Sequence, residues 1–169
     1  MVTFLLSAHI LVAIVFVGSI TVAASLFPRY ARQAFAELPA HGADLGVIRM
    51  LHRITGTYAA VALTVPFLGI VTAVALHVLG EAWVMVSTAL TGVAGLVLAL
   101  VVVPGQRRVL VEFDEPAGED PSDGPALRHS DGAALLPRLA MVTGIFNLIW
   151  VAIVVLMVLR PGSTTLVHP

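Results

Sequence analysis

Four apolar segments, each about twenty residues long or longer, constrain this chain more than any other feature of its sequence. They run over residues 2–27, 54–76, 82–103 and 139–159. A helix needs about 20 mostly apolar residues to cross the hydrocarbon core of a bilayer. An open sheet cannot satisfy its edge backbone groups in lipid, which excludes strands. The sequence therefore predicts an all-α protein, a four-helix transmembrane bundle that forms a single domain over residues 1–169.

The composition agrees with this prediction. Hydrophobic residues make up 59% of the chain and charged residues only 11%, whereas a soluble domain has about 25% charged residues. The absence of cysteine excludes disulfides and cysteine-ligated metals, and a net charge of −1 does not indicate a nucleic-acid partner. All nine basic residues are arginine, which together with the abundance of Ala, Val and Gly suggests a bacterial source of high GC content.

The arginines predict how the chain is threaded. Loops on the cytoplasmic side of a membrane carry an excess of basic residues. Only Arg160 lies on one side of the predicted spans, and the other side holds the remaining eight: Arg29, Arg32, Arg49, Arg53, Arg107, Arg108, Arg128 and Arg138. We therefore expect a multi-pass protein of the inner (plasma) membrane with both termini outside. The first apolar run is too long for a signal peptide and is expected to be retained.

The two connections on the arginine-rich side differ in character. Residues 30–38 have the pattern of a short interfacial helix after Pro28, and residues 107–113 are expected to prolong the third helix. Residues 114–136 are rich in Pro, Gly, Asp and Glu and lack the apolar surface needed for a core. They are expected to form a disordered acidic cytoplasmic loop, either a solvated linker or a docking site for a partner.

Helix association in lipid depends on close packing at small residues and on polar contacts between helices. The third span has a ladder spaced for this at Ser87, Thr91, Gly95 and Ala99. The same face is equally suited to a homo-oligomer or to docking on a larger membrane complex.

The fourth span carries Gly144 and, near its centre, Asn147. The Asn147 amide should face another helix, with Thr64, Thr72 or the hydroxyls of the third span as its partner. Pro66 should kink the second span.

His9 is a titratable residue within the first apolar span, and such residues are candidates for function. Three roles remain open: hydrogen bonding between helices, ligation of haem or a metal, and proton transfer. His77, Met85 and Met157 lie on the same side of the predicted membrane. With His9 they form a conceivable set of soft ligands for Cu(I) or haem iron, His9 and His77 being the candidate haem ligands.

Part of the sequence resembles known families. The features are His9, Gly18 and LFPRYARQA (26–34) in the first span and RMLHRITG (49–56) at the start of the second. They resemble small four-helix bacterial membrane proteins of the copper-resistance-D and HemJ type, including uncharacterised ones. The HemJ resemblance implies haem b at the first-helix histidine and protoporphyrinogen oxidation, and the copper-resistance-D resemblance implies copper uptake. The chain lacks the usual first-helix tryptophan, so only His9 is carried over, as a ligand.

Three classes of function follow as expectations. The first is a haem- or copper-linked membrane protein that uses His9. The second is a non-catalytic structural or accessory subunit of a membrane complex, and the third is a small transporter lined by Asn147, Thr64 and Thr72. The sequence has no nucleotide-binding loop, no paired carboxylates within the spans and no serine nucleophile motif. A role other than catalysis is therefore favoured.

Overall fold

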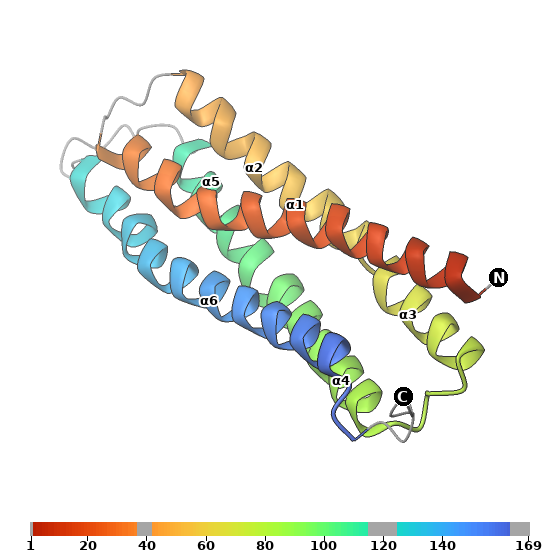
Figure 1. Ribbon diagram of the computed structural model, residues 1–169. Coiled ribbons are helices and arrows are strands. Elements are labelled where there is room, and N and C mark those ends of the chain that lie inside the picture. Colours follow the sequence, from red (N-terminus) through yellow and green to blue (C-terminus); the bar gives the residue numbers. More distant parts are fainter. Residues whose placement is uncertain (1, 37–41, 115–124, 163–169) are drawn as a thin grey trace.

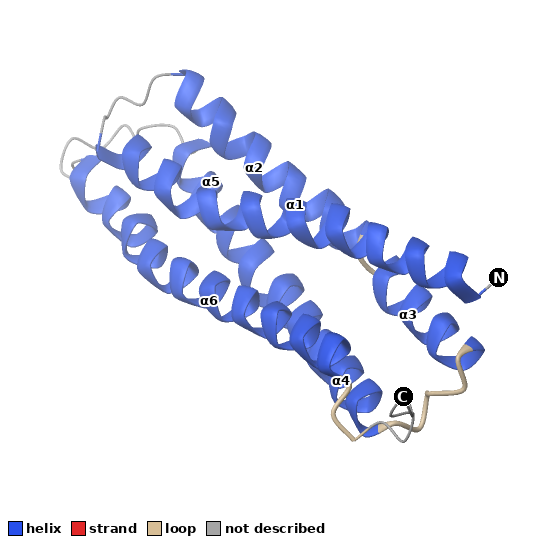
Figure 2. Ribbon diagram, viewed as in Figure 1, coloured by secondary structure: helices blue, strands red, loops and turns tan. Residues whose placement is uncertain are grey.

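The computed structural model of the chain describes residues 2–36, 42–114 and 125–162, and side chains within these ranges except at 42–44 and 125–131. All regular secondary structure in this part is helical, as Figure 2 shows. The elements, in chain order, are α1 (Val2–Ala36), α2 (Gly42–Val61), α3 (Thr64–Ala75), α4 (Ala82–Val97), the π-helix η1 (Leu98–Val102), α5 (Val103–Asp114) and α6 (Pro125–Leu159).

These elements form four rods, because α2 and α3 are nearly continuous and α4, η1 and α5 follow one another without a break. Four helices are long and apolar enough to cross a membrane, and they span Val2–Ala36, Leu45–Ala75, Ala82–Asp114 and Gly132–Leu159. The prediction of an all-α protein with four long apolar helices is confirmed. In Figure 1 the start of α1, the end of α6 and the connection from α3 to α4 lie at one end of the bundle.

The outer surface of the bundle is apolar. Phe4, Leu148 and Val158 are 75%, 69% and 74% exposed, and many other large aliphatic side chains are exposed on all four rods. Contiguous apolar surfaces of this extent are rare on soluble monomers. A surface of this kind is compatible with contact to lipid chains.

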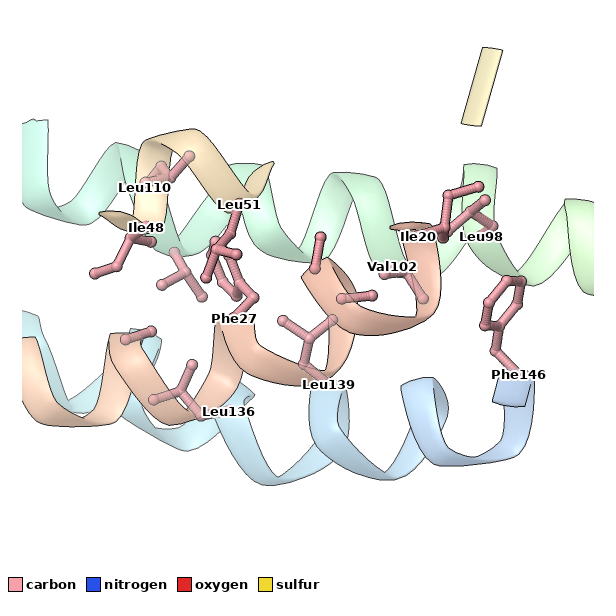
Figure 3. Close-up of a cluster of buried hydrophobic side chains, with 14 of the residues drawn as sticks. Ile20, Phe27, Ile48, Leu51, Leu98, Val102, Leu110, Leu136, Leu139 and Phe146 are labelled. Carbon is pink, nitrogen blue, oxygen red and sulfur yellow. The ribbon is translucent and has the colours of Figure 1, made fainter. Parts of the chain in front are cut away.

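The core is centred on α1, towards the end of the bundle where α1 terminates. Ile20, Ala23, Phe27, Ala31 and Ala34 recur at helical spacing and are almost completely buried. The alanines allow α1 to approach α2 and α6 closely. Figure 3 shows Phe27 among the apolar side chains of the neighbouring helices, Ile48, Leu51, Leu110, Leu136 and Leu139.

All four rods extend further than the predicted spans at the arginine-rich end of the bundle. Helix α1 does not end at Pro28 but continues through it to Ala36. The prediction of a separate helix over 30–38 is therefore wrong for residues 30–36, and residues 37 and 38 lie outside the described part. Proline removes one backbone hydrogen bond within a helix, and the burial of Phe27 and Ala31 on either side of it holds the helix together. Helix α2 begins at Gly42, well before residue 54, because Ile48 and Leu51 pack in the core.

The prediction of a disordered segment over 114–136 is wrong for residues 125–136, which are the first part of α6. Proline is favourable in the first turn of a helix, and α6 starts at Pro125. Further along, Leu136 is buried in the core, which stabilises this part of the helix. Residues 115–124 lie outside the described part. The predicted extension of the third helix over 107–113 is confirmed by α5.

Candidate functional site

His9 is buried between α1 and α3 and lies in the apolar first part of α1. Its imidazole packs against Gly69 of α3. A Cβ atom on Gly69 would lie 3.0 Å from His9 Cε1 and 3.6 Å from both ring nitrogens. The absence of a side chain at Gly69 therefore creates the space that the imidazole occupies.

A break in the second rod positions the groups around His9. The helix is interrupted at residues 62–63, between α2 and α3. Pro66 has no N–H with which to bond the Ala62 carbonyl, and the Val65 N–H bonds that carbonyl instead, at 3.0 Å. The interruption predicted from Pro66 is thus confirmed. It brings the start of α3, with Val65 and Gly69, against the imidazole of His9.

The hydrogen bonding of the buried His9 side chain is incomplete. Its imidazole lies near the backbone of Val65. The Nδ1 atom is buried and has no hydrogen-bond partner among the described residues. A buried polar atom without a partner costs free energy, and such an atom in a folded protein calls for an explanation.

The other predicted donors are more exposed than His9. His77 follows the end of α3, is exposed and has a positive φ of 58°. Met85 is 63% exposed on α4, and Met157 is half-buried on α6. No three of the described His, Asp and Glu side chains gather into a cluster that fits a metal ion. The role of His9, His77, Met85 and Met157 as ligands for haem or copper stays a prediction.

A second group of polar side chains lies at the arginine-rich end of the bundle. Gln106 of α5 is completely buried, and its Oε1 atom lies 3.2 Å from His52 Nδ1 of α2. Its amide nitrogen donates to the hydroxyl of Thr55 at 3.5 Å, and that hydroxyl donates to the Leu51 carbonyl at 2.9 Å. These side chains connect the second and third rods by hydrogen bonds within the core.

Gln106 is not among the residues that the sequence patterns single out. A signal was present, because Val102, Gln106 and Val109 have helical spacing and share a buried face. An amide on such a face needs a partner on a neighbouring helix. The identity of that partner depends on the arrangement of the helices.

The predicted packing residues occupy different environments. Ser87 is buried, and the half-buried Thr91 donates its hydroxyl to the Ser87 carbonyl at 2.8 Å. Gly95, Ala99 and Gly144 are exposed on the outside of the four rods. At both glycines a Cβ atom would meet nothing within 4 Å. Of these positions, only Ser87 is buried between the helices of the chain.

Asn147 has a different partner from the predicted ones. Its amide nitrogen donates to the hydroxyl of Ser25 of α1 at 3.0 Å, across the α1–α6 contact. The hydroxyls of Thr64 and Thr72 instead donate to carbonyls of their own rod, Val61 at 2.8 Å and Leu68 at 2.7 Å. Asn147, Thr64 and Thr72 therefore each form a hydrogen bond with a different partner.

Comparisons with protein-family models, with curated proteins and with solved structures find no match to this chain.

Proposed function

We propose that the chain is a multi-pass protein of a bacterial inner membrane, with four spans and both termini outside. The four apolar rods and their apolar outer surface support insertion in lipid. The distribution of the arginines supports the orientation, because eight of the nine belong to connections that lie on the same side. Tag accessibility in intact cells is the test. A C-terminal tag should be labelled from outside, and protection of that tag would contradict the orientation.

Within the membrane, we propose that His9 ligates haem iron or Cu(I). The observation that carries this proposal is the buried Nδ1 atom of His9, which has no hydrogen-bond partner in the described structure. A neutral imidazole is a good ligand for both metals. Because it is the buried member of the predicted set, His9 is the single protein donor proposed, and further ligands would be exogenous.

The experiment compares visible absorption and metal content of wild type, His9→Ala and His77→Ala, each purified in mild detergent after expression with haem and copper supplied. Wild type and His77→Ala should retain a haem band or bound copper, and His9→Ala should lose it. A colourless, metal-free wild type would contradict the proposal and make His9 a packing residue. Equal retention by His9→Ala would show that the ligand binds elsewhere.

The second candidate is a non-catalytic subunit of a membrane complex or homo-oligomer. The outward position of Gly95 and Gly144 favours it, because helices of another chain can approach closely at exposed glycines. Replacing both glycines by leucine should then abolish a cross-linked higher-mass species. His9→Ala should leave that species intact, which separates this candidate from the first.

A further inference from the structure

A groove between α5 and α6 at the arginine-rich end of the bundle combines two cations with apolar walls. Arg108 of α5 and Arg138 of α6 line it, and both side chains are exposed. Its volume is about 170 Å³, several times the ~30 Å³ of a water molecule. The remaining walls are largely aliphatic and are formed by Leu100, Val101, Pro104, Leu135 and Leu139.

The geometry of the third rod explains why the groove lies here. The rod passes through the π-helix η1, in which the Val103 N–H bonds the Leu98 carbonyl, and Pro104 follows directly. π-Helical turns are rare and occur frequently at functional sites. At Gly105 a Cβ atom would lie only 3.0 Å from Leu139 Cδ1. The two helices therefore approach closely at Gly105, beside the wider space of the groove.

Within the part of the chain that the structure describes, the two arginines of the groove have no acidic partner. Among the described residues, the ion pair is formed by Arg49 and Asp114, at a different place on the surface. Arg108 and Arg138 take no part in an ion pair within that described part. Two guanidinium groups on facing helices repel each other, and an anion between them would relieve this repulsion and accept several hydrogen bonds.

We propose that this groove binds an anionic phospholipid, with its phosphate at Arg108 and Arg138 and an acyl chain along the aliphatic wall. Basic pockets between transmembrane helices on the cytoplasmic side suit anionic lipid headgroups. Leu100 lies eight residues before Arg108, about 12 Å deeper along the helix, where an acyl chain would run. A free phosphate would leave that wall uncovered, so a lipid is the better fit.

The inference rests on the proposed membrane insertion and orientation, which place the groove in the cytoplasmic leaflet. It does not depend on His9. Each variant below therefore retains His9, and measurement of bound haem or copper on the same samples reports separately on the role proposed for that residue.

Native mass spectrometry of the full chain in detergent, with added phosphatidylglycerol or phosphatidylcholine, tests the proposal. Arg108→Gln/Arg138→Gln should lose retained phosphatidylglycerol, by about fivefold in affinity per arginine. The matched control is Arg53→Gln/Arg107→Gln, which removes the same charge from exposed arginines that do not line the groove. It should retain the lipid.

A third variant, Leu135→Trp, keeps both charges and fills the aliphatic part of the groove. It should also weaken phosphatidylglycerol binding, and it preserves the test if the double arginine variant does not fold. Three outcomes would overturn the proposal: equal loss in the control variant, retention of phosphatidylcholine to the same extent, or full competition by glycerol phosphate. The last outcome would identify a site for a free anion.

Discussion

Two buried polar side chains, Gln106 and His9, lie towards opposite ends of the bundle and differ in their hydrogen bonding. At the arginine-rich end, the side chain of Gln106 is hydrogen bonded to His52 and Thr55. Towards the opposite end, within the described structure, buried polar atoms of His9 and Ser87 have no hydrogen-bond partner. In lipid no water is present to satisfy such atoms. The comparison indicates that Gln106 is hydrogen bonded within the core, whereas His9 retains unused bonding capacity.

Packing of the core around Phe27, towards the arginine-rich end, is the first feature to test. Phe27→Ala removes a side chain that is 0% exposed among residues of several helices. Truncation of a buried phenylalanine typically costs about 3–5 kcal/mol, so the free energy of unfolding in detergent should fall by about that much. Phe67→Ala is the control, because Phe67 is 66% exposed. Equal losses in both variants would remove the distinction between core and lipid-facing surface.

The contact between His9 and Gly69 should produce the next largest effect. Gly69→Val places a branched side chain where the imidazole lies, and overpacking of this kind costs about 1–3 kcal/mol. His9→Ala in the same chain should restore most of the lost stability in thermal unfolding. The control is Gly92→Val, since a Cβ atom at Gly92 meets nothing within 4 Å. Failure of His9→Ala to rescue Gly69→Val would show that the strain arises elsewhere.

A smaller effect is expected from the hydrogen bonds of Gln106. Gln106→Leu should lower the free energy of unfolding by about 1 kcal/mol, because His52 and Thr55 lose their partner. A double-mutant cycle with His52→Leu should give a coupling energy of about 0.6 kcal/mol. Gln33→Leu is the control at an exposed position. A coupling energy of zero would mean that the contact between Gln106 and His52 does not contribute to stability.

The smallest effect is expected at the surface. Arg49 and Asp114 form an ion pair with side chains that are 52% and 56% exposed. Exposed pairs contribute about 0–1 kcal/mol, so Arg49→Gln should change the melting temperature little, and less still at high salt. A loss as large as that of Gln106→Leu would show that this pair is more important than its exposure suggests.

Much of the fold could be predicted because it depends on local properties of the sequence. The four apolar segments determine the four rods, and Pro66 breaks the second rod because it lacks an N–H. Helix ends were less predictable. Pro28 has the same chemistry as Pro66, yet α1 continues through it because Phe27 and Ala31 are buried on both sides. Whether a proline interrupts its helix therefore depends on tertiary packing.

The candidate site could be predicted only in part. His9 was singled out by its place in an apolar span, but its neighbour Gly69 lies sixty positions away in the chain. The pairing of Asn147 with Ser25 was missed for the same reason, since these residues are separated by 122 positions. Which residues meet across helices depends on how the rods are rotated and ordered. Spacing within a single helix carries no information about that arrangement.

The most direct test of the account is ¹⁵N NMR of the histidine-labelled protein in detergent, with Cu(I) or haemin added. The His9 signals are assigned by their absence in His9→Ala. Binding at the unpartnered Nδ1 atom should shift or broaden the His9 signals, whereas the signals of His52, which is bonded to Gln106, should stay unchanged. His9 signals that do not respond to either ligand, in a protein that remains folded, would contradict the proposed role of this residue.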